Sequence, residues 1–172
     1  MCSSSHPSSP RAVTREPERP AAPAQDKTVF DLLRTTCREL VELLDASTAV
    51  VSRVIGDLLV ELVVFTRADR PLQLGHEYLI SDFPLTAEVI TRLEPRRVSR
   101  LDADADPHEA SLLEQFGFDS LLMLPVAPHG EAWALLEVYH EHGRRFSDDD
   151  ERLALPAVER AAAALEQLAP RG

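Results

Sequence analysis

Hydrophobic positions recur every three or four residues near both ends of the chain. Near the N-terminus this spacing is kept by Val29, Leu33, Thr36, Leu40 and Leu43. It predicts a helix from about Lys27 to Leu44. Near the C-terminus it is kept by Ala154, Val158, Ala161, Leu165 and Leu168. A second helix is therefore expected there, with Ser147 as its N-cap and Pro156 as the site of a kink.

The middle of the chain has the shorter period of β-strands. Residues 48–54 and 58–66 are rich in β-branched and aliphatic residues and flank the turn signal Gly56-Asp57, which predicts a hairpin. Residues 120–126 and 132–140 predict a second hairpin around Pro128-His129-Gly130. A strand is also expected over residues 74–80, and a short polar edge strand over 97–101.

Two helices are predicted between these strands. The first begins at Ser81-Asp82-Phe83-Pro84, because proline is tolerated in a first helical turn, and it runs to about Leu93. The second begins at Asp106-Pro107 and ends at Gly117, a natural C-cap.

Composition divides the chain into one domain and its ends. Residues 1–26 are rich in proline and serine and poor in apolar residues, so a disordered tail is expected there. Residues 27–169 form the expected domain, and residues 170–172 a disordered end. No apolar run is long enough for a membrane span, and no secretory signal is evident.

Charge and cysteine content narrow the function classes. The chain has a formal net charge of -11, and residues 1–27 hold four basic against three acidic residues, so the domain itself is strongly acidic. Such a surface repels nucleic-acid backbones and anionic membranes, so neither is an expected partner. The two cysteines, Cys2 and Cys37, suggest neither a disulfide framework nor a zinc site, which favours a reducing cytoplasm.

The order of predicted elements, together with three segments, resembles the GAF domain family. The segments are 78–86 (YLISDFPLT), 117–126 (GFDSLLMLPV) followed by 132–138 (AWALLEV), and Arg145-Phe146-Ser147. The resemblance covers roughly residues 28–168. It implies an α/β (α+β) fold with a central antiparallel sheet of five to six strands, helices on both faces, and N- and C-terminal helices packed together.

The resemblance also implies a small-molecule pocket on one face of the sheet and terminal helices that dimerise and signal. The pocket candidates are Tyr78, Ser81, Asp82, Phe83, His108, Leu112, Phe116 and Trp133. The candidates for a homodimer interface are Leu33, Leu40, Leu43, Val158, Leu165 and Leu168. Phe118 is expected to pack near the pocket. Ala134 stands where a glycine is common in the family, and its larger side chain would narrow the pocket.

Several of these candidates also have a simpler structural interpretation. Ser81 and Asp82 either contact an anion or cap a helix. His108 is more simply an exposed histidine of a first helical turn than a ligand contact, and Trp133 is more simply a core residue than a ligand-stacking one. Pro107 and Glu109 flank His108 where bilin-bearing relatives place a cysteine, so no covalent bilin is expected there.

The sequence offers little support for a metal site or for catalysis. His140 and His142 lack a third ligand nearby, so no metal site is expected. No nucleophile–base pair is evident, so the protein is expected not to be an enzyme. The leading hypothesis is a sensory domain that binds an unidentified small molecule and signals to a separate partner. The alternatives are a ligand-free protein-interaction module and a sensor that carries a haem or another chromophore at His108.

Overall fold

The computed structural model describes residues 24–67 and 76–168, with side chains from residue 28 onward. It is a mixed α/β fold with six strands and four α-helices in the described part. The helices are α1 (Ala24–Leu43), α2 (Pro84–Arg92), α3 (Pro107–Phe116) and α4 (Asp148–Leu168). The strands are β1 (Thr48–Ile55), β2 (Leu58–Thr66), β3 (Glu77–Leu79), β4 (Arg96–Ser99), β5 (Ser120–Val126) and β6 (Ala134–His140). Two short 3-10 turns, η1 (Ile80–Asp82) and η2 (Pro128–Gly130), connect them.

The six strands form one antiparallel sheet in the order β3-β2-β1-β6-β5-β4. Both predicted hairpins are confirmed, β1 with β2 and β5 with β6. Gly56 lies in the first turn with φ +59°, a conformation that glycine adopts without steric cost. The two hairpins meet where β1 pairs with β6, at the centre of the sheet.

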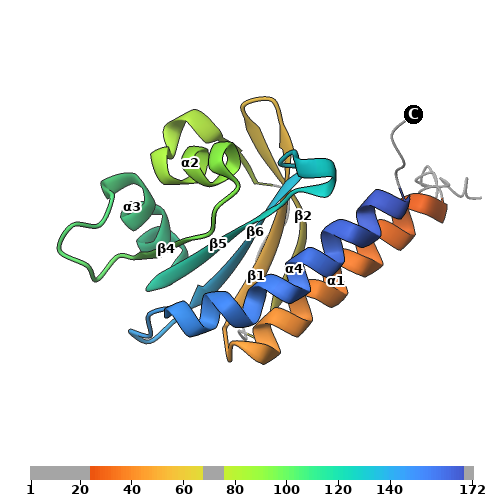
Figure 1. Ribbon diagram of the computed structural model, residues 1–172. Helices are drawn as coiled ribbons and strands as arrows, with labels where there is room; N and C mark the ends of the chain where they lie inside the picture. Colours follow the sequence, from red (N-terminus) through yellow and green to blue (C-terminus); the bar gives the residue numbers. More distant parts are fainter. Residues whose placement is uncertain (1–23, 68–75, 169–172) are drawn as a thin grey trace, which may run out of the picture.

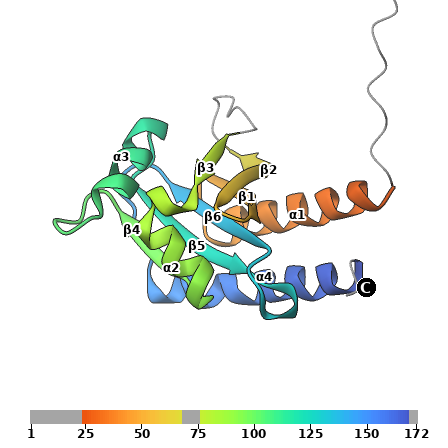
Figure 2. The ribbon, with the colours of Figure 1, turned by 90° about the horizontal axis from the view of Figure 1, so that it is seen from above.

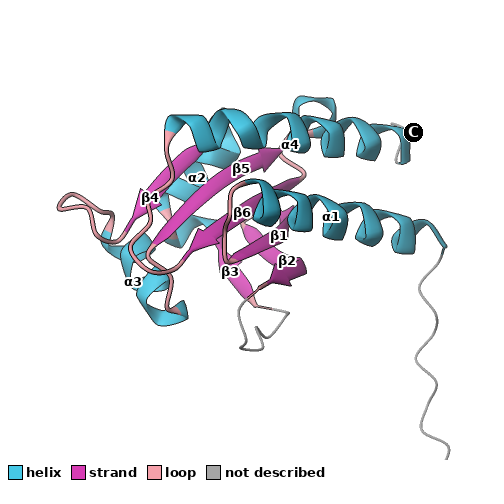
Figure 3. Cartoon of the chain, turned by 90° about the horizontal axis from the view of Figure 1, so that it is seen from below, coloured by secondary structure: helices cyan, strands magenta, loops and turns pink. Residues whose placement is uncertain are grey.

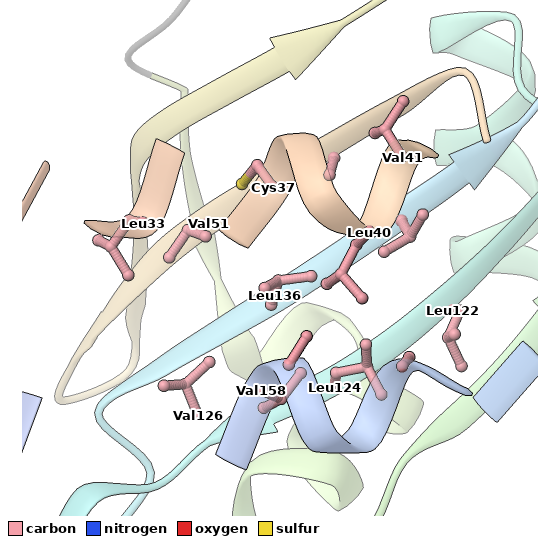
Figure 4. Packing of buried hydrophobic residues seen from close by; sticks show 14 of the residues in the cluster. Leu33, Cys37, Leu40, Val41, Val51, Leu122, Leu124, Val126, Leu136 and Val158 are labelled. Atoms are coloured by element: carbon pink, nitrogen blue, oxygen red, sulfur yellow. The ribbon is translucent and has the colours of Figure 1, made fainter. Parts of the chain in front are cut away.

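Helices α1 and α4 lie side by side across one face of the sheet, as Figures 1 and 3 show. The apolar stripe of each helix is buried between its neighbour and the sheet, in a core that includes Leu40, Leu124, Leu136 and Val158 (Figure 4). At the N-terminus of α4, Ser147 and Asp150 cap each other: the Asp150 carboxylate accepts from the Ser147 N–H at 2.8 Å, and the Ser147 hydroxyl accepts from the Asp150 N–H at 3.2 Å. The predicted packing of the terminal helices is confirmed.

Helices α2 and α3 cover the opposite face, which is the nearer one in Figure 2. Val89 of α2 and Leu113 of α3 form a second core there with Leu121, Met123 and Leu135 of the sheet. Alternate residues of β5 and β6 thus enter different cores, because successive side chains of a strand point to opposite faces. The expected caps of α3 are confirmed: Asp106 accepts two backbone hydrogen bonds, and Gly117 ends the helix with φ 74°.

A β-bulge interrupts the regular alternation of β2. Val51 of β1 pairs with Val63, but Ser52 pairs with Glu61, so Leu62 is the extra residue on β2. Strict alternation would place Glu61 and Val63 on the same face of the sheet. Instead Val63 packs in the core under the terminal helices, and Glu61 faces the side covered by α2 and α3.

Several boundaries differ from the expected ones. Helix α1 begins at Ala24, before the expected start at Lys27. The predicted strand over 74–80 lies partly outside the described residues, and its visible part, β3, ends at Leu79 because Ile80 begins the turn η1. The expected tail falls mostly outside the described residues, as does the C-terminal end. No helix in residues 24–67 or 76–168 has the length and apolar character that crossing a membrane requires.

Candidate functional site

A cavity of about 50 Å³ lies between the sheet and helices α2 and α3. Its floor is formed by residues of β1, β2 and β6, and its walls by His76 and Tyr78 at β3 and by residues in or next to α2 and α3. The lining residues are Thr48, Val50, Leu59, Glu61, Val64, His76, Tyr78, Phe83, Thr86, Leu112, Phe116, Phe118, Glu137 and Tyr139. A mostly apolar cavity with a few polar groups is the usual form of a small-molecule site.

Aromatic rings make up much of the cavity wall. His76 stacks on Tyr78, with ring centroids 6.1 Å apart, and meets the edge of Phe116 at 5.7 Å. Tyr78 in turn meets Phe83 edge-on at 6.1 Å. The rings therefore form a connected group at one side of the cavity.

Two carboxylates reach the cavity from the sheet. Glu61 of β2 accepts a hydrogen bond from the backbone N–H of His76 at 3.1 Å, and its Oε2 lies 3.2 Å from His76 Nδ1. Glu137 of β6 lies beside Tyr139, with which it shares a side-chain hydrogen bond. The bulge at Leu62 is what brings Glu61 to the same face as Glu137.

Burial raises the pKa of Glu137 to about 8, and the nearby charges of Glu109 and Glu61 raise it further, against the smaller opposing effect of Tyr139. Glu137 is therefore held mostly protonated at neutral pH in the absence of a compensating positive charge. Burial also raises the pKa of Tyr78 and, with the help of Glu137, that of Tyr139, so both phenols stay neutral.

A third carboxylate lies immediately behind the wall. Glu109 of α3 is 1% exposed and accepts hydrogen bonds from the Thr86 N–H at 3.3 Å and the Thr86 hydroxyl at 2.9 Å. Burial raises its pKa, and the two bonds from Thr86 oppose that shift. Glu109 thus joins α3 to the first turn of α2, whose N-cap residue Phe83 offers no side-chain cap.

Seven of the eight sequence-predicted pocket residues fall into two groups. Tyr78, Phe83, Leu112 and Phe116 line the cavity. Ser81, Asp82 and His108 instead line an adjoining open groove of about 450 Å³, which shares Phe83 and Leu112 with the cavity. His108 is exposed there, in the first turn of α3.

The expected anion contact at Ser81 does not fit the geometry. Its N–H and hydroxyl both donate to the Asp57 carboxylate, at 3.0 and 2.6 Å. The alternative of a helix cap is also wrong for Ser81, because α2 starts after Phe83. These bonds fasten the turn η1 to the β1–β2 turn.

Trp133 does not line the cavity and is instead a core residue, the simpler of its two interpretations. Trp133 packs against the core under α1 and α4, on the other face of the sheet, and Arg53 lies over its ring at 4.5 Å from the centroid. Ala134 is buried in that same core, so it does not narrow the cavity. Phe118 does line the cavity, as expected.

Four of the six expected dimer-interface residues are buried within a single chain. Leu33, Leu40, Val158 and Leu165 are at most 4% exposed and belong to the core between the terminal helices and the sheet. They are therefore not available to a second copy. Leu43, 44% exposed, and the half-buried Leu168 remain at the surface.

The polar side of the cavity is not predicted from the sequence. Glu61, Glu137, Tyr139 and His76 were not predicted as site residues, nor was Glu109 behind them. One signal was present: Glu61 and Glu137 are single carboxylates inside otherwise apolar strands, where a charged residue needs a specific environment.

A cysteine is absent from the described cavity wall. Cys37 lies fully buried in the opposite core, where burial raises the pKa of its thiol to about 12 and keeps it unreactive.

The GAF domain family model matches residues 30–165, most of the chain. The chain belongs to the GAF domain family. GAF domains are a family of sensory domains, and the antiparallel sheet with helices on both faces is the GAF fold. No curated protein matches the chain at a significant level.

Solved GAF domains resemble this one in fold. The phycocyanobilin-bound GAF domain of a cyanobacterial phytochrome has a TM-score of 0.69 at 19% identity, covering 86% of this chain and 97% of that one. The blue-light absorbing form of the Thermosynechococcus elongatus PixJ GAF domain has a TM-score of 0.73 at 11% identity, covering 86% and 90%. The GAF domain of a Bacillus halodurans two-component sensor histidine kinase has a TM-score of 0.66 at 14% identity, covering 80% and 93%. At these identities the likeness concerns the fold alone.

Proposed function

We propose that this GAF domain is a non-catalytic sensor, which binds a small molecule in the cavity under α2 and α3 and signals through α1 and α4 to a separate partner protein. The observation that carries the proposal is the cavity itself, a mostly apolar space into which a few polar side chains of the sheet converge. Its described lining residues include neither a serine nor a cysteine nucleophile, which favours binding over catalysis.

A route from the cavity to the terminal helices runs through β6. Glu137 and Tyr139 line the cavity, whereas Leu136 and Val138, which alternate with them along the strand, pack in the core under α1 and α4. Any ligand that shifts this strand acts on both faces at once. Signalling requires that the ligand bind one arrangement of these elements more tightly than the other.

The cavity does not favour covalent attachment of a bilin, the chromophore class bound by the phytochrome GAF domain of similar fold. Its volume of about 50 Å³ holds a few water-sized groups, and Cys37 faces the other core. The alternative of a haem held by His108 is not favoured either, since His108 lines the groove and not the cavity.

The small volume of the cavity supports one second candidate function, a ligand-free protein-interaction module. Native mass spectrometry of freshly purified protein, with an absorbance spectrum of the same sample, separates the two. Under the sensor proposal the wild type retains or takes up an added small mass. A bare mass, with no stabilisation by any member of a metabolite panel, would favour the interaction module.

Two β2 variants make that experiment specific. Val64 lines the cavity, so Val64→Phe fills it, whereas Val60 lies on the same strand outside the lining set. We expect Val64→Phe to lose the bound mass and Val60→Phe to keep it. Equal binding by both variants would place the ligand elsewhere.

We further propose that the domain is a cytoplasmic homodimer that uses the exposed sides of α1 and α4. Leu43 and Leu168 are the surface leucines of the expected interface set. Sedimentation of Leu43→Glu tests this: a monomer that remains folded supports the interface, and an unchanged dimer contradicts it.

A further inference from the structure

We infer that the cavity selects a small organic cation, with an ammonium, amidinium or guanidinium head group, over neutral and anionic ligands. This inference rests on the proposed sensory function and specifies the ligand class of the same site. It follows from the charges of the wall, its aromatic rings and its size.

The charged groups of the cavity wall are acidic. Glu61 and Glu137 line the cavity, Glu109 lies behind Thr86, and neither arginine nor lysine occurs among the described lining residues. The one imidazole of the wall, His76, is already paired with Glu61. An anion entering this space would lie beside Glu61 and Glu137 without a basic partner, so it would be repelled by ionised carboxylate or would require Glu137 to stay protonated.

The aromatic rings add a second, independent preference for positive charge. His76, Tyr78, Phe83, Phe116, Phe118 and Tyr139 all line the cavity. The face of a tyrosine or phenylalanine ring carries negative electrostatic potential and attracts a cation within about 6 Å of its centroid. Carboxylates backed by several such rings are the combination that binds ammonium and guanidinium groups.

The cavity suits an organic cation better than a metal ion. Within the described residues, no three side chains of His, Cys, Asp or Glu converge as a metal-ligand set. The rest of the wall is apolar, with Val50, Leu59, Val64 and Leu112. A strongly hydrated divalent ion needs several oxygen ligands, whereas an alkylated cation gains from apolar contact.

A bound cation would also stabilise the ionised form of Glu137, which burial disfavours. Burial and the neighbouring carboxylates favour its neutral form, so pairing with a cation must be accompanied by loss of its proton. Cation binding is therefore expected to release a proton at neutral pH, and to strengthen as pH rises toward about 8.

Three probes of similar size and different charge test the inference: methylguanidinium chloride, methylurea and sodium acetate. Each is titrated at millimolar concentration into the full ¹⁵N-labelled chain while the backbone amides of β2 and β6 are followed by NMR. We expect saturable shifts with methylguanidinium, at least about tenfold weaker binding of methylurea, and no pocket shifts with acetate. Equal binding of methylguanidinium and methylurea, or preferred binding of acetate, would overturn the inference.

A matched pair of variants locates the effect. Glu137→Gln keeps the side-chain shape and removes the charge, and Glu77→Gln makes the same change on the exposed edge strand β3. We expect Glu137→Gln to weaken methylguanidinium binding about tenfold or more and to abolish its rise with pH, and Glu77→Gln to leave both unchanged. Equal affinities in both variants would show that the cavity carboxylate does not recognise the cation.

The outcomes also separate this inference from the proposed sensory function. Suppose that methylguanidinium causes no shifts, whereas a neutral or anionic metabolite causes shifts that Val64→Phe abolishes. That result would support the sensory pocket and contradict the preference for cations. If methylguanidinium shifts amides equally in wild type and Val64→Phe, its binding lies outside the cavity and the inference also falls.

Discussion

The carboxylate of Glu109 in α3 caps the first turn of α2 by accepting hydrogen bonds from both the N–H and the hydroxyl of Thr86, at 3.3 and 2.9 Å. A helix N-terminus has unpaired N–H groups, and here the partner comes from a different helix. The arrangement holds the two helices in fixed relation over the cavity. A buried carboxylate is stabilised by such bonds, so the pair contributes to both stability and pocket shape.

Replacing Thr86 by valine should loosen this connection. Thr86→Val keeps the side-chain shape but removes the hydroxyl donor, leaving a buried carboxylate less satisfied. We expect the free energy of unfolding to fall by about 1–3 kcal/mol in urea titrations. The control is Thr35→Val on α1, where an exposed hydroxyl bonds Asp31 of the same helix and the change should stay within about 0.5 kcal/mol. An equal effect of the two variants would contradict the role of Glu109.

Glu137 should make the protein less stable as pH rises. Its pKa is about 8 in the folded state against about 4.5 for an ordinary glutamate, so the folded state binds the extra proton between these values. Its contribution to stability is therefore complete below about pH 4.5 and is lost as pH rises through about 8, on the order of a few kcal/mol. We expect the stability of wild type relative to Glu137→Gln to decline over this range in urea titrations. A difference independent of pH would show that Glu137 is not held protonated.

His140 should give the opposite trend in acid. Its ring is 3% exposed and packs on Phe146 with centroids 4.5 Å apart, and burial lowers its pKa below 6.5, with a further contribution from Arg144 against the opposing effects of Asp150 and Asp45. Because the unfolded state binds the proton more readily, the stabilising effect is complete above about pH 6.5 and is lost as pH falls below it. Thermal unfolding should show wild type losing stability relative to His140→Leu below that pH. Parallel pH profiles of the two proteins would rule this out.

Two leucines of α1 should respond very differently to truncation. Leu40 is fully buried under α4, whereas Leu43 is 44% exposed. We expect Leu40→Ala to cost about 2–5 kcal/mol of unfolding free energy, because it leaves a cavity in the core. Leu43→Ala should change it by about 0.5 kcal/mol or less. Similar losses of stability in chemical denaturation would contradict the burial of Leu40 and the exposure of Leu43 in this fold.

The local signals in the sequence predicted the elements well. Asp106 and Gly117 marked the ends of α3, and the turn at Gly56 marked the first hairpin, because caps and turns depend on residues adjacent in the chain. The spacing of Leu33, Leu40, Val158 and Leu165 predicted two amphipathic helices. It did not show that these leucines face each other and the sheet within one chain, because periodicity identifies an apolar face and not what covers it.

The sequence by itself determined the GAF fold, its two hairpins, and the aromatic part of the site at Tyr78, Phe83 and Phe116. Only the tertiary structure decided the acidic part. The extra residue at Leu62 turns Glu61 toward the cavity, and strand pairing places Glu137 on that same face, opposite Trp133. The physical reason is that a bulge and a strand pairing join residues far apart along the chain, so no local pattern of polar and apolar positions records which carboxylates will meet.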